Sequence, residues 1–478
     1  WVTRAAESGS TKRPSGYSAA DRPVGLDKRI EEIEILWKLD RRAEARPLLD
    51  QLLAEGYESP RFLELAAFIY LDDGQIRLVK EMIVRLEATG EAKEETIDRL
   101  KANVYLAEEN WTEARPYYAK LYARAPNEFE TAHTYAQILT LTREWKEAKR
   151  VYRNLRPEKN KAVEIGREYH RGVEELSHNA ELFFQYWHRP NGQRDYKIAQ
   201  RAEFWMAPWL RIGTSVGEDV YRRPIVGAQA AIRRFVMTHL VEAEGYYKKL
   251  FSFLMGWQSN YYNHSDYQEL HWRAKMDTKW FRSRYEFIWN RLSYDPIESV
   301  EKQGRLHRYE MGHELNILDR IQVGHTFRTE WYRVPGANNQ VNGQGDLGYD
   351  IGNDAYVNLV LWKRLPYLAM NYHFRRSNWY QPFVGANEVL GYLTEEKAHY
   401  GGFYVEHQIG KYFEFVGSVT RGNDYKRDVH YLYWYFEPRV WIKDFAKLSF
   451  SYEYDLGDSG TAGTGDSQIF TGKANIYF

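Results

Sequence analysis

Strict alternation of apolar and polar side chains near the C-terminus constrains the fold of this chain more than any other feature. From Ala446 to Leu456 every even-numbered residue is apolar or aromatic, and every odd-numbered residue is polar. Successive side chains of a β-strand point to opposite faces, so this period predicts a strand whose faces meet different surroundings. A soluble antiparallel sheet gives the same alternation, so the number of such segments has to decide.

About sixteen such segments, each of roughly 10 to 14 residues, run from residue 178 to the C-terminus. Very short connections alternate with longer ones, which is typical of bacterial transmembrane barrels. The short ones include Ala207-Pro208, Gly410-Lys411 and Lys443-Asp444, and the long ones include 335–352 and 380–397.

A literal count gives seventeen strands, because the sequence from 225 to 249 can be divided into two strands. A barrel whose two chain ends lie on the same side needs an even number of strands. We therefore expect about sixteen, with Tyr221 to Phe235 mainly a loop and Thr238 to Lys249 one strand.

Composition excludes several classes of protein. No stretch approaches the ~18 to 20 continuous apolar residues of a transmembrane helix, and mean hydropathy is -0.67. Lys plus Arg and Asp plus Glu number 66 each, so we expect no nucleic-acid partner. The absence of cysteine is compatible with an oxidising compartment.

The first part of the chain has a helical period instead. Glu44-Ala45-Arg46-Pro47 returns as Glu113-Ala114-Arg115-Pro116, 69 positions later, and Trp111-Thr112-Glu113-Ala114 returns as Trp145-Lys146-Glu147-Ala148 after 34. A period of about 34 with two helices is typical of the tetratricopeptide repeat (TPR). We expect a flexible linker over 1–25, periplasmic TPR helices over 26–176 and an outer-membrane β-barrel over 177–478. Because an array that starts abruptly exposes an apolar edge, we also expect further repeats upstream of Trp1.

The phase of each strand predicts which residues face the lumen. The inward set carries most of the charge of the strands, with Glu and Asp interspersed with Arg and Lys. Within it, a set of carboxylates, one arginine and three tyrosines forms the candidate polymer-binding surface: Glu242, Glu244, Glu269, Glu286, Glu310, Glu314, Glu330, Glu406, Glu414, Tyr431, Tyr433, Tyr435, Glu437, Arg439, Glu453 and Asp455. Two interpretations remain open and can both hold. In the first interpretation, the charges form ion pairs that stiffen the wall of the barrel. In the second, the carboxylates and aromatic rings form a binding surface along which a polymer passes.

The segment from Pro335 to Gly352 is rich in glycine and asparagine, which is typical of a mobile loop. Our hypothesis is that it folds inward as a gate. The candidate gating residues are Asn338, Asn339, Asn342, Asp346, Tyr349 and Asp350.

Motifs for catalysis are weak. No His-x-x-x-His motif accompanied by Glu lies in a helical segment, and no glycine-rich phosphate loop joins a strand to a helix, so we expect no metal and no cofactor. Ser265 and Asp266 beside His264 form the one triad-like cluster, but neighbouring loop residues rarely converge as a triad does. We expect a protein that is not an enzyme.

The last strand places Phe470, Gly472, Ala474, Ile476 and Phe478 on its outward face. This pattern resembles the C-terminal signal by which outer-membrane proteins are recognised for barrel assembly. TPR repeats followed by a barrel of about sixteen strands resemble the exopolysaccharide export porins of synthase-dependent biofilm systems, which include the Pel, poly-N-acetylglucosamine and cellulose exporters. The glutamate-rich lumen and the truncated array favour the C-terminal part of a Pel-type exporter.

This resemblance implies an exopolysaccharide as cargo, in particular a partly deacetylated, cationic amino-sugar polymer, and outer-membrane lipid around the barrel. It also implies a periplasmic lipoprotein or a polysaccharide-modifying enzyme docked on the repeats. The alternative is a membrane-anchored scaffold on which another secretion or electron-transfer complex assembles.

Overall fold

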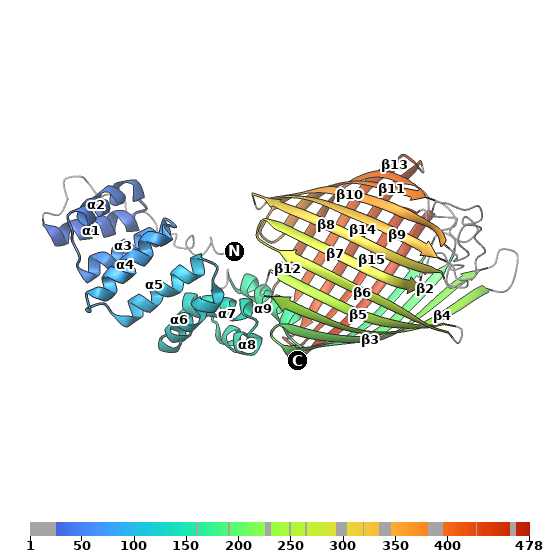
Figure 1. The fold of residues 1–478 in the computed structure, drawn as a ribbon, viewed down its shortest axis with the longest axis horizontal. Coiled ribbons are helices and arrows are strands. Elements are labelled where there is room, and N and C mark those ends of the chain that lie inside the picture. The colour runs from blue at the N-terminus through green and yellow to red at the C-terminus, as the bar shows by residue number, and fades with distance from the viewer. Residues whose placement is uncertain are drawn as a thin grey trace. The chain divides into compact units, whose positions relative to one another are not determined.

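The computed structural model describes residues 25–158, 161–189, 192–224, 231–247, 250–262, 265–292, 304–318, 320–333, 346–380, 395–426, 428–458 and 465–478 (Figure 1). Two compact units divide between Pro157 and Glu158. The first is helical, and the second contains one helix and the barrel. The expected gate residues Asn338, Asn339 and Asn342 and the expected linker up to residue 24 lie outside the described residues.

The helical unit consists of helices in antiparallel pairs. Their bounds are α1 Leu26–Lys38, α2 Arg42–Ala54, α3 Pro60–Asp72, α4 Ile76–Ala88, α5 Glu94–Ala107, α6 Trp111–Arg124, α7 Phe129–Leu141 and α8 Trp145–Asn154. The first helices of successive pairs begin at residues 26, 60, 94 and 129, so the pairs repeat every 34 or 35 residues. The structure thus confirms the repeat period and the helical solenoid that the sequence predicts.

Local chemistry sets where these helices begin and end. Gly56, Gly74 and Gly90 follow α2, α3 and α4 with φ of +78°, +70° and +68°, a left-handed conformation that glycine adopts without steric cost. Ser59 caps α3, because its Oγ accepts a hydrogen bond from the backbone N–H of Phe62 at 3.3 Å. The apolar faces meet in a continuous core that includes Phe62 and runs from α1 to α5.

The second unit is a closed barrel of antiparallel strands. Their bounds are β1 Asn179–His188, β2 Arg194–Ala207, β3 Leu210–Pro224, β4 Ala231–Tyr247, β5 Phe251–Tyr262, β6 Ser265–Asp277, β7 Phe281–Leu292, β8 Arg305–Ile317, β9 Ile321–Arg333, β10 Asp346–Trp362, β11 Tyr367–Tyr380, β12 Glu396–Ile409, β13 Phe413–Asp424, β14 Val429–Ile442, β15 Ala446–Asp458 and β16 Gly465–Tyr477. Each strand pairs with its neighbours in sequence, and β1 pairs with β16. Sixteen strands in the described residues confirm the expected barrel.

The first and last strands close the barrel over their full length. β1 and β16 are in register from Asn179 opposite Tyr477 to His188 opposite Gln468. Beyond the last pair, the backbone N–H of Phe478 donates to the carbonyl of His178 at 3.0 Å, and the N–H of His178 donates back at 3.2 Å. The C-terminal residue therefore takes part in the seam.

Short connections lie at the end of the barrel that carries His178 and Phe478, which we call the turn end. Ala207, Gly410 and Lys443 lie at such connections, as predicted. The opposite end, called the loop end, carries the long connections after β7, β9 and β11.

The expected loop from Tyr221 to Phe235 was wrong. Residues 221–224 continue β3 and residues 231–235 begin β4, with Tyr221 opposite Arg234. Polar side chains at the ends of two paired strands resemble a loop in sequence, because the strands extend past the apolar band.

The two faces of the wall differ as the alternation predicts. Outward positions carry exposed apolar side chains, such as Phe403 and Val419, each 54% exposed, and Phe450 at 51%. The intervening positions carry the charged and hydroxyl groups that face the lumen. This surface is what a barrel in a lipid bilayer requires.

Helix α9, Ala162–Leu176, belongs to the barrel unit, although the sequence period groups it with the repeats. Its buried residues include Ile165, Tyr169, His170 and Val173. The physical reason is that a helix buries an apolar face against whichever surface is available, and here the surface is the barrel.

None of the helices in the described parts of the chain is long and apolar enough to cross a membrane.

Replacing Phe62 with Ala should destabilise the helical unit by about 3–5 kcal/mol, because a fully buried aromatic ring is removed from the core. Urea denaturation of the full chain in detergent, followed by the helical circular-dichroism signal, measures the change. Val84→Ala on the exposed face of α4 is the control, since this side chain is 65% exposed. Equal loss of stability in both variants would contradict the assigned core.

Candidate functional site

Helix α9 is held at the turn end of the barrel by polar and aromatic contacts. Glu174 accepts a hydrogen bond from Lys447 Nζ at 2.6 Å, and Arg167 forms an ion pair with Glu406. The His170 ring stacks on the Trp441 indole with centroids 4.1 Å apart and planes 9° apart. Two ion pairs and one ring stack, to three separate strands, fix the helix in position.

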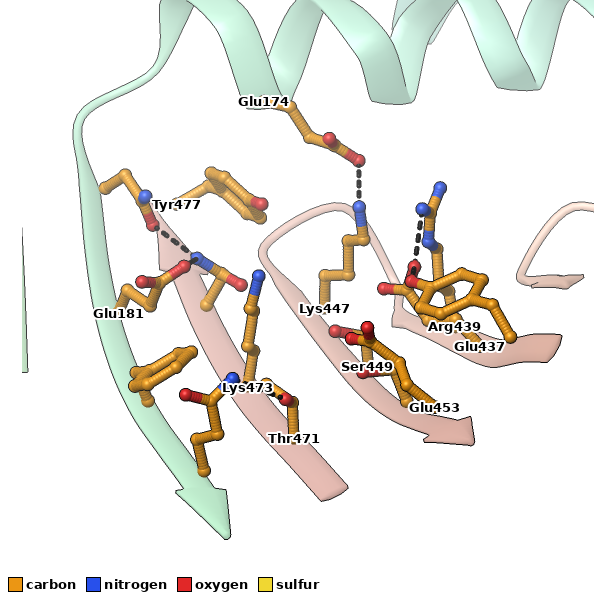
Figure 2. A pocket seen from close by; sticks show the side chains of 16 residues that line it. Glu174, Glu181, Glu437, Arg439, Lys447, Ser449, Glu453, Thr471, Lys473 and Tyr477 are labelled. Carbon is orange, nitrogen blue, oxygen red and sulfur yellow. Dashed lines mark hydrogen bonds and ion pairs between the residues drawn. The ribbon is translucent and has the colours of Figure 1, made fainter. Parts of the chain in front are cut away.

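A cavity of about 590 Å³ lies between α9 and the inner wall formed by β14, β15, β16 and β1 (Figure 2). Glu174 reaches from the helix to Lys447 on the wall, as Figure 2 shows. The charged residues that line the cavity are Glu174, Glu181, Glu437, Arg439, Lys447, Glu453 and Lys473. We call this cavity the mouth pocket.

The charges of the mouth pocket differ in their partners. Glu437 is paired with Arg439 at 2.7 Å. Glu181 instead accepts from the side-chain amide of Asn475 at 3.0 Å, and Glu453 accepts from the Tyr433 hydroxyl at 3.1 Å. The donors shown for the last two carboxylates are therefore neutral, which leaves their negative charge less compensated than that of Glu437.

The strand register places all of the residues predicted to line the lumen on inward positions of the wall. Tyr431, Tyr433 and Tyr435 follow one another on β14, with Glu437 and Arg439 continuing the same face. Their binding of a polymer stays a prediction.

Many lumen carboxylates are already paired within the wall. Glu330 accepts from Tyr332 at 2.8 Å and pairs with Arg308, and Glu414 pairs with Arg439 at 2.7 Å. Glu244 pairs with Arg211 on the adjacent strand β3, and Glu242 pairs with Arg201 on β2, the next strand beyond it. Because such pairs link side chains across strands, they support the interpretation in which the charges stiffen the wall.

Further tyrosines donate to glutamates in the same way. Tyr356 donates to Glu314 at 2.8 Å, and Tyr404 donates to Glu406 at 3.4 Å. Tyr435 donates to Glu437. A glutamate that accepts from tyrosine is held in one orientation and still has a second oxygen with which it can accept from a ligand, so wall stiffening and ligand binding remain compatible.

Three of the expected gating residues lie in a strand and not in a loop. Asp346, Tyr349 and Asp350 belong to β10. The Tyr349 ring stacks on Tyr380 at 4.9 Å, and Asp350 pairs with Arg328 at 3.3 Å. The sequence does not reveal this because glycine and asparagine at the end of a strand resemble a loop.

The triad-like cluster of the sequence lies mostly outside the described residues, which include the Asp266 side chain but not that of Ser265. His264 lies outside them, and Asp266 accepts hydrogen bonds from Ser259 and, at 2.8 Å, from Gln268. Within the same residues no group of three or more His, Cys, Asp or Glu could hold a metal ion.

Sequence reasoning missed the contribution of α9. Arg167, His170 and Glu174 repeat at helical spacing, but the same spacing occurs in every repeat helix. The one available signal was the strand that begins at Asn179, only a few residues after α9 ends. Such a short connection keeps the helix near the barrel rim.

No protein-family model and no curated protein matches this chain. Among solved structures, one described as a bacterial polysaccharide outer membrane secretin aligns with 63% of this chain and 98% of its own, at a TM-score of 0.50 and 8% identity. The CymD monoaromatic hydrocarbon channel aligns with 65% of this chain and 91% of its own, at a TM-score of 0.34 and 9% identity. The TPR protein YrrB aligns with 31% of this chain and 75% of its own, at a TM-score of 0.27 and 13% identity. The similarity to the secretin shows that this chain has the fold of an outer-membrane β-barrel.

Lowering the pH should weaken the docking of α9. Burial lowers the pKa of His170 from 6.5 to about 4, while Asp444 and Glu414 raise it and Lys447 lowers it. An undocked helix would restore the ordinary pKa, so the docked state is favoured fully above pH 6.5 and loses stability as the pH falls toward 4. The loss should reach about 3 kcal/mol.

Spin labels at Glu175→Cys on α9 and Lys411→Cys at the turn end can measure this, because the chain has no native cysteine. We expect the distance distribution to broaden between pH 6.5 and 4. A His170→Phe variant keeps an aromatic ring on Trp441 and should lose the pH dependence. The same broadening in that variant would assign the effect to another group.

Proposed function

We propose that this protein exports an exopolysaccharide across the outer membrane through the lumen of its barrel. The observation that carries the proposal is the mouth pocket, a polar cavity at the turn end whose lining continues into the inward face of β14. A hydroxyl-rich polymer requires such a lining, because sugars bind through carboxylates, amides and hydroxyls. The fold shared with a polysaccharide secretin supports the same class of cargo.

The charges favour a partly deacetylated, cationic amino-sugar polymer. Glu181 and Glu453 line the pocket and accept from the neutral donors Asn475 and Tyr433. Arg201 lies opposite Glu181 in the register, but neither carboxylate forms an ion pair among the described residues. An ammonium group on a sugar would supply a cation at ion-pair distance. Lys473, on the same wall, lies over the Phe183 ring at 5.7 Å and opposes a cationic ligand.

The tyrosines of β14 extend this surface along the lumen. Tyr431, Tyr433 and Tyr435 lie two residues apart, which is a spacing of about 7 Å along a strand. Aromatic rings stack on the apolar faces of sugars. A row of rings would allow a polymer to move from one weak contact to the next.

The helical repeats would lie in the periplasm and dock a lipoprotein or a polysaccharide-modifying enzyme. Repeat solenoids present extended concave surfaces that bind other proteins. In bacterial barrels the short turns face the periplasm, and α9 and Phe478 lie at the end with the short turns.

Conductance of the purified full chain in planar bilayers tests the proposal. We expect partly deacetylated amino-sugar oligomers to block the pore at lower concentration than neutral glucans of equal length. Glu453→Gln should weaken this block by about tenfold, because one charge-assisted hydrogen bond is lost. Lys473→Gln is the matched control in the same pocket, and it should strengthen the block by amino-sugar oligomers because it removes a cation that repels them.

The controls separate the possible failures. An open pore that no glycan blocks would count against polysaccharide export and favour the scaffold function. A block that is equal for neutral and amino-sugar oligomers, and unchanged in both variants, would keep a glycan as cargo but remove its cationic character.

A further inference from the structure

The outward face of strands β11 to β14 changes from apolar to cationic toward the loop end. The register aligns the outward residues of these strands in successive rows. The row nearest the turn end is apolar and consists of Met370, Phe403, Val419 and Trp434. The second row consists of Tyr372, Gly401, Arg421 and Leu432, and the third of Phe374, His399, Asn423 and His430. The row nearest the loop end pairs two cations, Arg376 and Lys397.

A hollow of about 430 Å³ opens in this face. Its outward lining is Tyr372, His399, Gly401, Arg421, Asn423 and His430, and we call it the outer-face notch. Gly401 lies in register between Tyr372 and Arg421, so the absence of a side chain there makes room between two long ones. An added Cβ at Gly401 would meet only ordinary contacts at 3.6 and 3.8 Å, so the backbone does not require glycine at this position.

Arg421 in the notch and the two cations of the row nearest the loop end give this part of the face an excess of positive charge. Within the described residues Arg421 has no ion pair, and neither does the Lys397 ammonium group. Arg376 and Lys397 are direct cross-strand neighbours, and like charges in that arrangement destabilise a sheet. Glu395, which precedes β12, is bonded to Lys426 at 2.8 Å and offsets the charge of Arg376 only in part, through a longer-range interaction. An anion from outside the chain would offset the repulsion.

The position of the notch identifies the source of that anion. The row directly below it contains Phe403 and Val419, which are exposed as lipid-facing residues are. Charged residues on the lipid face of a barrel become less costly toward the interface, where headgroups lie. The long connections of the loop end are external in bacterial barrels, so the headgroups beside the notch belong to the outer leaflet.

We propose that the outer-face notch binds a phosphate group of a phosphorylated glycolipid in the outer leaflet. Arg421 would hold the phosphate through its planar guanidinium, which matches phosphate geometry in a bidentate manner. Lys397 would add a second cation from the adjacent strand. The Tyr372 ring would lie against the sugar, and the acyl chains would continue over Phe403 and Val419. This site is separate from the lumen and does not depend on what the pore exports.

Binding of purified bis-phosphorylated lipid A to the detergent-solubilised full chain tests the proposal. Native mass spectrometry can count bound lipids and compare affinities between variants. We expect Arg421→Gln to weaken binding by about tenfold or more, because one charged partner of the phosphate is lost. Arg421→Lys should lose less, because it keeps the charge without the bidentate geometry.

Two further variants make the result specific. Gly401→Leu should weaken binding by filling the hollow while all charges stay in place. Lys411→Gln removes one exposed cation from the turn end of the same strands β12 and β13, and should bind as the parent protein does. Arg421→Lys also guards against failed folding in Arg421→Gln.

Three results would overturn the proposal. Unchanged affinity in both Arg421→Gln and Gly401→Leu would show that lipid A binds elsewhere. Equal affinity for lipid A from which both phosphates have been removed would show that the phosphate is not recognised. Complete displacement by inorganic phosphate at the concentration that saturates the notch would assign it to a free anion instead of a lipid.

Discussion

Pairing of β1 with β16 is the interaction on which the rest of the barrel depends. In a bilayer every backbone N–H and C=O must find a partner within the protein, so a sheet that spans it must have no open edge. The register from Asn179 to His188 supplies these bonds at the seam, and the mutual hydrogen bonds of His178 and Phe478 extend it. The closed sheet contains sixteen strands in the described residues, and a barrel of that number encloses a lumen wide enough for a solute.

Closure also separates lipid on the outside from the lumen on the inside, and successive side chains of each strand face these two environments alternately. A shift of one residue in any strand would turn its lumen charges toward lipid, so the apolar outward set holds the register in place. The inward carboxylates then meet arginines of neighbouring strands, as Glu330 meets Arg308 and Glu414 meets Arg439. The same wall can be rigid and still offer Glu181 and Glu453 to a ligand, because their partners are neutral.

Helix α9 connects the seam to the lumen. It immediately precedes β1, and its side chains reach β12, β14 and β15 through Glu406, Trp441 and Lys447. The helix thereby forms one side of the mouth pocket. A contact made by stacking and ion pairs, with a histidine buried in it, responds to pH more readily than an apolar core does.

The sequence alone determined what depends on local periodicity. The 34-residue repeat specified the helix pairs, and the alternation together with Phe478 specified the strand number and the inward phase of residues such as Glu453. Neighbouring residues carry these patterns, so no knowledge of distant contacts is needed. Where polarity made the end of a strand resemble a loop, as in residues 221–235 and at Asp350, the prediction of a loop was wrong.

Only the tertiary structure decided which side chains meet. The docking of His170 on Trp441, the pairing of each glutamate, and the alignment of Gly401 between Tyr372 and Arg421 depend on the register of strands far apart in the chain. Alternation tells which face a residue occupies but not which neighbour lies opposite, since one strand can slide by two residues and keep its faces. The hydrogen bonds that close the barrel remove that freedom.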